Sequence, residues 1–369
     1  MRYLPNNLSQ IVVACFTLVA TSVAAIDEDM VYRAMQDEMQ RNMRELRLGD
    51  LPRAYHMTYS LSIRKSISIH STLGDVQDID TGTVAILSVA VRVGGPKFDN
   101  TNFFDVSLGF FGSSDDEEAF KTRRIPFEFT YNSLRRELWL ATDACYKQAV
   151  ELYAKKEGSL KNRTRTDTTW DFGYLPPETL TNLESSPRVW NVTTLASLCS
   201  DVSAVFRAAP GVQSVRVGTE YVPEETIMLT SEGRRMHKFE SFAGFEIVAS
   251  GQSADGMPVG NTYAAYGITP EDLPSRDSLI RAGVMVGDML TKATNAQSIE
   301  AYSGPVIFEG QAAGEVVAQI FAPNLVAQRQ PLSDGGFSAN DRYLAFQNKI
   351  GARVLPEWLN VRAVPSREK

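Results

Sequence analysis

The chain has 369 residues, of which 43% are hydrophobic and 22% charged, and its formal net charge is −7 at pH 7. This length favours two or three domains, and the apolar fraction suffices for a sizeable core. The acidic balance argues against a nucleic-acid-binding protein, because neutralising phosphates needs clustered lysine and arginine.

The N-terminal segment has the layout of a secretory signal peptide. Arg2 supplies a positive charge, residues 11–23 are mostly apolar, and small residues precede a cleavage point near Ala25. We therefore expect a signal peptide over residues 1–25 and a secreted or periplasmic mature protein, with a retained N-terminal anchor as the alternative. No later run reaches the ~18 apolar residues of a membrane helix, so no membrane span is expected in the mature chain.

Residues 27–47 have the apolar spacing of an amphipathic helix, with Val31, Met35, Met39 and Met43 at intervals of four. A methionine stripe at this spacing favours core packing over a cofactor site.

The period then changes from four to two. Apolar residues alternate with mostly polar ones from residue 55 to 63 and again from 89 to 93, which predicts strands with one covered face. The acidic run at residues 115–118 lacks the spaced ligands and the glycine of a calcium loop, so it indicates a solvated loop or a helix start.

Three further helices are predicted. Ser133 is expected to open a long helix that Gly158 stops, a second helix begins near Thr193, and a third follows Ser275. Between the last two, strands run over residues 212–267, with a hairpin turn at residues 253–256. Strand runs interleaved with single helices favour an α+β fold of antiparallel or mixed sheets with long helices.

Two cysteines remain after cleavage of the signal peptide. Cys145 and Cys199 both fall on helices with apolar neighbours. A disulfide between them and two buried free thiols are both compatible with the sequence.

The residues that carry chemistry do not form a recognisable motif. The histidines, His56, His70 and His237, each stand alone in a strand-like segment, without a metal-ligand spacing. There is no glycine-rich phosphate loop after a strand and no Gly-x-Ser-x-Gly elbow. Two alternatives stay open. One is a zinc site built from all three histidines, and the other is a catalytic pair of facing carboxylates. Such groups can meet in space without being close in the sequence.

The stretch GPVIFEGQAAGEVVAQIF, residues 304–321, predicts a short strand, a small-residue turn and a helix. Packing explains every residue of this pattern: residues 306–308 form a buried strand, the small residues allow a tight turn, and Val317, Ile320 and Phe321 cover the core.

The wider stretch YSGPVIFEGQAAGEVVAQIFAPNL, preceded by TSEGRRMHKFESFAGFEIVASGQ and a helix of about twenty residues, resembles the TldD/PmbA family, once called modulators of DNA gyrase. The stretch DEMQRNMRELRLGDLPRAYHMTYSL looks like a secreted branch of that family, and the resemblance covers most of residues 27–362.

The resemblance implies an α+β N-terminal domain and a β-rich C-terminal domain. It also implies that TldD-like members are zinc metallopeptidases, with a His-Glu, three residues, His motif on a helix and a later cysteine. PmbA-like members share the fold, lack these ligands and pair with the TldD type to trim short or unfolded peptides.

This chain resembles the PmbA-like side. With Gly314 aligned to the glycine before the zinc helix, the motif positions fall near Ala318, Gln319 and Pro323. None of these side chains supplies imidazole or a proton-accepting carboxylate, and no histidine follows His237. We therefore expect no catalytic residue, no metal ligand and no cofactor in this chain, with zinc only in a TldD-type partner subunit.

The expected division of the mature chain is an N-terminal TldD/PmbA-like domain over residues 26–300, then a strand-turn-helix and the start of an incomplete β-rich domain over residues 301–369. The predicted function is peptide processing as a zinc-free, non-catalytic or partner-dependent subunit. The alternatives are a periplasmic binding or structural protein without a peptidase role, and a hydrolase with unrecognised chemistry.

Overall fold

The computed structural model describes residues 27–104, 122–161, 169–174, 177–182, 190–297, 302–325, 332–333, 345–346, 349 and 351–362. The predicted signal peptide and the acidic run at residues 115–118 lie outside the described residues.

Helices and strands alternate in the order of an α+β protein. The helices are α1 (Glu28–Glu45), α4 (Tyr131–Leu160), α5 (Val192–Ala204), α6 (Arg276–Thr294), α7 (Gly310–Val316) and α8 (Ala322–Leu325), with 3-10 turns η1 (Val205–Ala208) and η2 (Pro270–Asp272) and the π-helical turn η3 (Val317–Phe321). The strands are β1 (Ala54–Thr72), β2 (Asp75–Gly95), β3 (Phe98–Asp99), β4 (Phe103–Phe104), β5 (Thr122–Ile125), β6 (Thr179–Asn182), β7 (Ser214–Thr230), β8 (Arg235–Gln252), β9 (Pro258–Gly267) and β10 (Leu332–Ser333).

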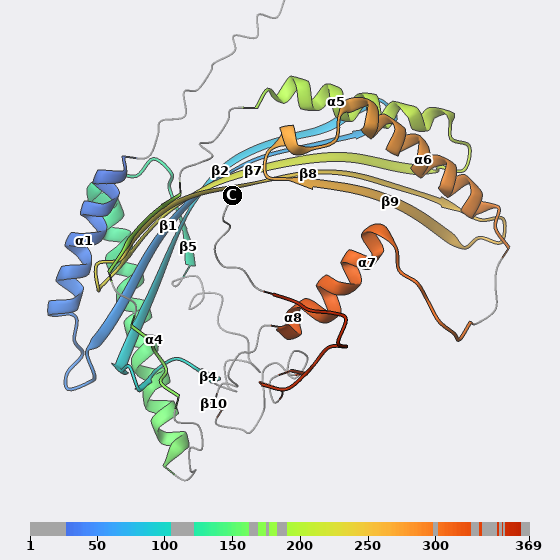
Figure 1. Cartoon of the computed structure of the whole chain (residues 1–369). Helices are drawn as coiled ribbons and strands as arrows, with labels where there is room; N and C mark the ends of the chain where they lie inside the picture. Colours follow the sequence, from blue (N-terminus) through green and yellow to red (C-terminus); the bar gives the residue numbers. More distant parts are fainter. Residues whose placement is uncertain are drawn as a thin grey trace, which may run out of the picture.

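A long, curved sheet is the centre of the molecule (Figure 1). Its strand order is β3-β2-β1-β7-β8-β6, with β5 also paired to β2 and β9 also paired to β8. The four longest strands, β1, β2, β7 and β8, pair antiparallel, whereas the short β6 pairs parallel to β8. The predicted α+β class is therefore confirmed.

The hairpin between β1 and β2 turns in two residues, Leu73 and Gly74, whose φ angles are 48° and 88°. Two positive φ angles define the turn whose twist matches that of the flanking strands. Helix α5 and the turn η1 hold this hairpin, because Ser203 Oγ accepts from the Gly74 amide at 2.8 Å and Arg207 Nε donates to the Leu73 carbonyl at 2.6 Å.

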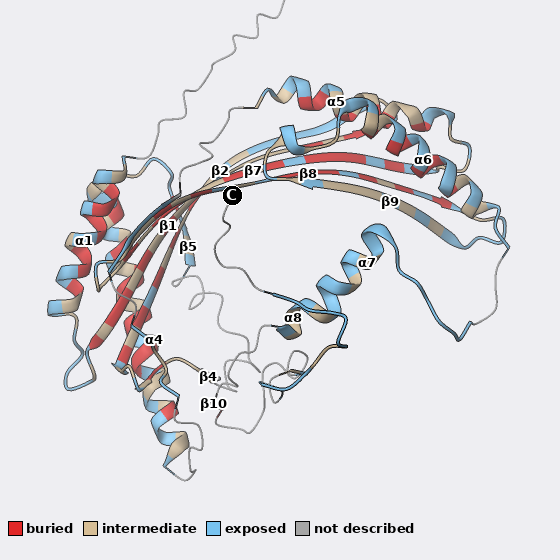
Figure 2. Cartoon of the chain, in the orientation of Figure 1, coloured by how far each residue is buried: buried red, intermediate tan, exposed pale blue. Residues whose placement is uncertain are grey.

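Two helix pairs cover the same face of the sheet, one pair at each end. Odd-numbered residues of β1 point to this face, since Tyr59 and Leu61 are buried near α1 and α4, and Ile69 is buried near α5. Figure 2 shows the buried residues concentrated where strands and helices meet. The α1–α4 core comprises Val31, Tyr32, Ala34, Met35, Met39, Ala54, Met57, Tyr59, Leu61, Ala85, Leu87, Val89, Val91, Val93, Ile125, Leu134, Leu138, Ala141, Cys145, Tyr146, Ala149, Val150, Ile227 and Leu229. The α5–α6 core comprises Ile69, Leu195, Ala196, Cys199, Val202, Phe206, Val215, Val217, Phe245, Ile247, Ala249, Leu279, Ala282, Val286 and Leu290.

The predicted helices are present, with corrected boundaries. Helix α4 begins at Tyr131 and continues through Gly158 to Leu160, whereas Ser133 and Gly158 were expected as its ends. Thr130 is the N-cap, because its side chain accepts from the Ser133 amide in a capping box. The methionine stripe of α1 packs as predicted, with Met35 fully buried.

Cys145 and Cys199 are both free and buried, and they lie in different cores. Of the two arrangements that the sequence allowed, the structure therefore has the buried free thiols. Across the described residues, no helix is both long and apolar enough to cross a membrane.

The segment after α6 differs most from the sequence-based expectation. The buried strand expected at Val306, Ile307 and Phe308 is wrong, because these residues form no strand and are 63%, 85% and 53% exposed. The expected helix does form from Gly310, but Val317 and Ile320 are 53% and 68% exposed instead of covering the core. Apolar periodicity indicates which side of a segment can be buried, but burial also needs a surface for that side to pack against.

Candidate functional site

The face of the sheet opposite the helices carries the candidate site, and we call it the open face. It is formed by even-numbered positions of β1, β7 and β8, with Arg64, Glu224, Lys238, Glu240 and Phe242 at its centre. Because successive residues of a strand point to opposite faces, the same alternation that builds the cores places these side chains together on the other side.

An alternating set of charges crosses the open face. Arg64 Nε and Nη2 both donate to Oε2 of Glu224, at 2.9 and 2.8 Å. Lys238 Nζ donates to Oε2 of Glu240 at 2.7 Å. Glu224 pairs in register with Arg64 on one side and with Glu240 on the other, so the four charges form one quartet.

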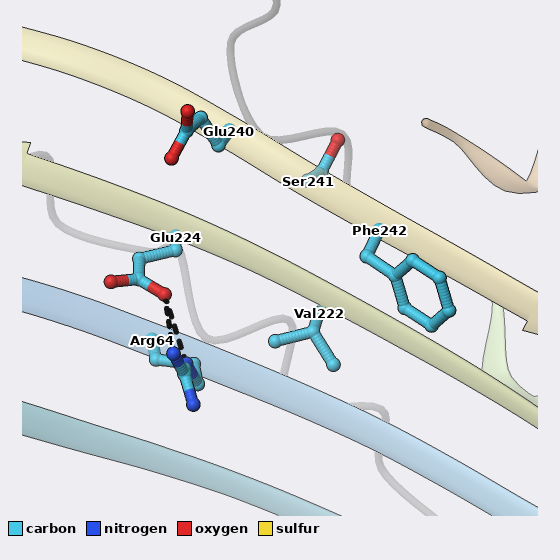
Figure 3. A pocket seen from close by; sticks show the side chains of 6 residues that line it. All are labelled: Arg64, Val222, Glu224, Glu240, Ser241 and Phe242. Carbon is cyan, nitrogen blue, oxygen red and sulfur yellow. Dashed lines mark hydrogen bonds and ion pairs between the residues drawn. The ribbon is translucent and has the colours of Figure 1, made fainter. Parts of the chain in front are cut away.

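A shallow hollow of ≈ 260 Å³ lies beside the quartet, lined by Arg64, Val222, Glu224, Glu240, Ser241 and Phe242 (Figure 3). Phe242 is 42% exposed, and its ring lies 5.7 Å from the ring of Tyr266, which is 64% exposed. Aromatic rings beside ion pairs provide contacts for both apolar and charged groups of a ligand.

The arrangement favours recognition over acid–base chemistry. Two carboxylates directly opposite each other repel, and here Arg64 and Lys238 offset that repulsion. Glu224 and Glu240 each accept a hydrogen bond from a cationic side chain. The four side chains can break these internal ion pairs and instead form ion pairs with charged groups of a ligand.

A buried ion network closes one end of the open face. Arg92 Nη1 lies 2.7 Å from Asp99 Oδ2, and Lys156 Nζ lies 2.7 Å from Asp171 Oδ2. Burial alone would raise the pKa of Asp99, but hydrogen bonds from Tyr55, Thr101 and Arg92 outweigh it and hold that pKa below its usual range. The side chains of Lys156, Asp99 and Asp171 are all fully buried, so the network is shielded from water.

His56 belongs to this closed end. Its Nδ1 lies 2.7 Å from Glu232 Oε1, and its ring lies 4.4 Å from the ring of Phe172. Burial alone would raise the pKa of Glu232, but hydrogen bonds from His56 and Ser231 outweigh it and lower that pKa. This pair ties β1 to the loop after β7.

The structure does not bring the three histidines together. His56 and His70 lie near opposite ends of β1, about 45 Å apart along an extended strand. His70 faces Arg216, and burial together with this guanidinium lowers the pKa of His70. His237 points to the helix-covered face, where its Nε2 lies 2.9 Å from Glu225 Oε1. No group of three metal-ligating side chains occurs within the described ranges.

The positions expected to align with a zinc motif lie in the segment that follows α6. Ala318 and Gln319 belong to the π-helical turn η3, and Pro323 belongs to α8. Gln319 Nε2 donates to Glu315 Oε1 in the preceding turn. Ala318 and Gln319 are exposed, and no group of three candidate metal ligands lies around them in the described residues.

Sequence reasoning did not single out the residues of the open face. The alternation of Ser60, Ser62, Arg64, Ser66 and Ser68 with apolar residues marks one polar face of β1. That pattern does not give the register with β7 and β8, so it could not place Glu224 and Glu240 beside Arg64.

Comparisons with known proteins give no sequence match. No protein-family model matches the chain, and no curated protein matches it. The chain is similar to three solved structures at low identity. A "putative modulator of a DNA gyrase" from Thermotoga maritima has 11% identity and a TM-score of 0.38, over 71% of this chain and 47% of that chain. TldE from Thermococcus kodakarensis has 10% identity and a TM-score of 0.40, over 68% and 46%.

A protein of the same description from Bacteroides thetaiotaomicron has 11% identity and a TM-score of 0.40, over 70% of this chain and 48% of that chain. The chain thus spans about half the length of each of these proteins. Similarity at this level carries no conclusion about activity. The names of these structures are those of the family that the sequence segments resemble, the modulators of DNA gyrase.

Proposed function

We propose that this chain is a secreted or periplasmic TldD/PmbA-like protein that takes part in peptide processing without a metal site of its own. It binds short or unfolded peptides on the open face and leaves amide hydrolysis to a TldD-type subunit that carries zinc. One observation carries the proposal: the positions that align with the zinc motif hold Ala318, Gln319 and Pro323. Zinc needs imidazole, thiolate or carboxylate ligands, and these side chains do not fit it.

The open face supports the peptide-binding part of the proposal. Extended peptides present side chains on alternate sides, and a sheet face offers matching rows of side chains. Arg64 and Lys238 suit acidic groups of a peptide, Glu224 and Glu240 suit basic groups, and Phe242 offers an apolar contact. This mixture fits a range of peptides better than one fixed small molecule.

A binding measurement with paired variants tests this site. Fluorescence anisotropy of short labelled peptides that contain acidic, basic and aromatic residues is expected to show binding to the purified chain. Arg64→Ala is expected to weaken it at least tenfold, since losing a hydrogen bond to a charged group costs about 1.5–3 kcal/mol. Lys147→Ala is the matched control, because Lys147 forms a similar exposed ion pair with Asp143 on α4. If Arg64→Ala and Lys147→Ala bind the peptides with equal affinity, the open face is not the peptide-binding site.

Metal analysis and mass spectrometry of the peptides test the zinc-free part. We expect no stoichiometric zinc and no cleavage by the chain alone, and cleavage on addition of a purified subunit that carries the His-Glu-x-x-x-His motif. Stoichiometric zinc together with cleavage by the chain alone would refute the proposal. Co-purification of the two subunits, with activity that depends on both, is the positive result.

One observation favours a second candidate, a hydrolase that uses facing carboxylates. Glu224 and Glu240 lie directly opposite each other on β7 and β8. Such an enzyme would cleave without zinc and lose activity in both Glu224→Gln and Glu240→Gln, while peptide affinity stayed within a few-fold. The proposed binding role instead predicts changed affinity and no cleavage in either variant.

A further inference from the structure

Helix α6 has two apolar sides, and only one of them packs inside the subunit. Its inner side buries Leu279, Ala282, Gly283, Val286, Gly287 and Leu290. Its outer side is an exposed stripe of Asp277, Arg281, Val284, Met285, Asp288, Met289 and Lys292. Val284, Met285 and Met289 are 48%, 49% and 53% exposed. A surface helix with a single buried face would carry polar residues here, so the apolar middle of this stripe needs another explanation.

The charges around this apolar middle are available for contacts between subunits. Asp277, Arg281, Asp288 and Lys292 meet no opposite charge of their own subunit within ion-pair distance in the described part of the chain. Their order along the helix is negative, positive, negative, positive, with Val284 and Met285 at the centre.

In an antiparallel pair of α6 helices, this order of charges on one helix is opposite in sign to the order on the other. A two-fold axis that crosses α6 between Val284 and Met285 places each residue opposite the one equally far from that point. Arg281 then faces Asp288 of a second copy, and Lys292 faces Asp277. Val284 faces Met285, and Met289 faces Ile280, which is partly buried against the α5–α6 core. Every opposed charge is therefore of opposite sign, as an interface between identical copies requires.

We propose that the outer stripe of α6 is a homodimer interface, in which two copies of this chain pair their α6 helices antiparallel about a two-fold axis. The balance of two acids and two bases argues against a membrane surface, because attraction to anionic lipids needs an excess of lysine and arginine. The stripe lies on the helix-covered side of the sheet, so pairing leaves the open face accessible (Figure 1). The inference is thus independent of the proposed function.

The small area of contact between two α6 helices implies a weak dimer. Two packed helices of this length cover less than the ~1,600 Å² of a standard interface, so the dimer should dissociate on dilution. Sedimentation equilibrium of the full chain over a range of concentrations is expected to show a reversible monomer–dimer equilibrium.

Charge reversal tests the predicted pairs. Arg281→Glu places two like-charged contacts in each dimer, as does Asp288→Arg, and each is expected to weaken dimerisation at least tenfold. The double variant Arg281→Glu with Asp288→Arg exchanges the two charges and should restore the dimer. Arg136→Glu, at an exposed site of α4, is the control and should leave the equilibrium unchanged. Positions 136, 281 and 288 are all exposed, and circular dichroism checks that each variant is folded.

Cysteine cross-linking tests the position of the axis. In a Cys15→Ser background, Met285→Cys lies one residue from its copy along the helix axis, about 1.5 Å, whereas Met289→Cys lies nine residues away, about 13 Å. We expect a disulfide-linked dimer from the first variant and none from the second. Cys145 and Cys199 are buried and should not interfere.

A monomer at all concentrations would overturn the proposal, as would a dimer unaffected by either single reversal. Equal cross-linking at positions 285 and 289 would also overturn it. Weakening by the single variants without rescue by the double variant would mean that the stripe binds a surface other than its own copy, and that result too is contrary to the proposal.

Discussion

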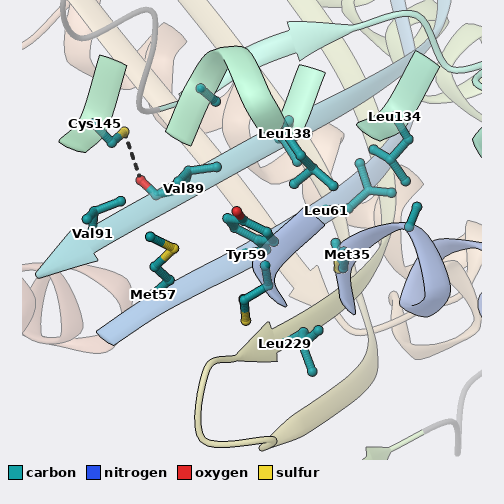
Figure 4. Close-up of a cluster of buried hydrophobic side chains, with 14 of the residues drawn as sticks. Met35, Met57, Tyr59, Leu61, Val89, Val91, Leu134, Leu138, Cys145 and Leu229 are labelled. Carbon is teal, nitrogen blue, oxygen red and sulfur yellow. Dashed lines mark hydrogen bonds between the residues drawn. The ribbon is translucent and has the colours of Figure 1, made fainter. Parts of the chain in front are cut away.

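The two ends of the sheet pack their helices in different ways, although the same strands run through both. The α1–α4 core is built from large side chains, among them Met35, Met57 and Tyr59 (Figure 4). Its polar atoms are paired inside it, since the Tyr59 hydroxyl contacts Asn42 Nδ2 at 3.0 Å and Thr142 Oγ1 at 2.8 Å. Beyond this core, the Lys156–Asp171 pair closes the end of the sheet.

The α5–α6 core instead depends on close approach of backbone. Gly283 faces Val202, Val205 and Phe206, and a Cβ at this glycine would lie 3.1 Å from Val205 Cγ2. A Cβ on Gly251 would collide with the carbonyl oxygen of Gly211, in the loop before β7. The same sheet is thus stabilised by a buried ion network at one end and by close backbone packing at glycines at the other.

The largest expected effect comes from the ion network. Lys156→Met removes the ammonium that donates to the buried Asp171 carboxylate and to the carbonyls of Asp99 and Thr101. Breaking a buried pair in this way costs about 3–5 kcal/mol, so urea unfolding should show that loss of free energy. Lys147→Met, on the exposed side of the same helix, is the control and should stay within about 0.5 kcal/mol of the original chain. If the two variants match, the network does not stabilise this end.

The next effect tests close approach at the other end. Gly251→Ala forces β8 away from the loop that precedes β7, and overpacking of this kind costs about 1–3 kcal/mol. Gly158→Ala is the matched control, because nothing lies within 4 Å of its added methyl group and it sits in helix α4. That control should keep or raise the free energy of unfolding, by up to about 1 kcal/mol. A neutral Gly251→Ala would show that the backbone contact can relax.

The contrast between the two ends also shows what the sequence could predict. Period-four and period-two patterns identified α1, α4, α5, α6 and the long strands, because each of these elements has a face covered by its own chain. The same reasoning failed at Val306–Phe308, where the apolar residues have no such cover. The open face needed the pairing of Arg64 with Glu224, which are 160 residues apart. Such register is fixed by hairpin turns and neighbouring strands, not by local pattern.

The two ends should lose stability at different pH values. The lowered pKa of Asp99 stabilises the fold fully above its ordinary value of 3.8, and this contribution is lost as pH falls through the lower folded value. The pKa of His70 is also lowered, from its ordinary value of 6.5. The stability of the fold therefore also decreases as pH drops below 6.5. Burial and Arg216 disfavour the His70 cation, while Asp78, Glu220 and Glu246 partly offset them.

Urea unfolding at a series of pH values should therefore decline in two steps. His70→Gln is expected to flatten the step below pH 6.5, and Asp99→Asn to flatten the step below pH 3.8 while also lowering stability at neutral pH. If the step near pH 6 remains in His70→Gln, a group other than His70 causes it.

The smallest perturbation uses the two buried thiols as reporters, one in each core. Cys145 Sγ donates to the Val89 carbonyl in the α1–α4 core, and burial raises the pKa of Cys199 to about 12 in the α5–α6 core. Since the thiolate is the reactive form, both should react with a disulfide reagent only after their core opens. In a Cys15→Ser background, Cys199→Ala leaves the first reporter and Cys145→Ala the second, each at a cost of about 1 kcal/mol.

We expect both thiols to become reactive over the same range of urea concentrations. Strands β1 and β7 contribute side chains to both cores, so neither core can open without disturbing strands of the other. Adding Lys156→Met should then speed the reaction of both thiols, although only Cys145 shares a core with its helix. Faster reaction of Cys145 alone would mean that the two ends open as separate units, and that the difference in packing divides the sheet into two regions of independent stability.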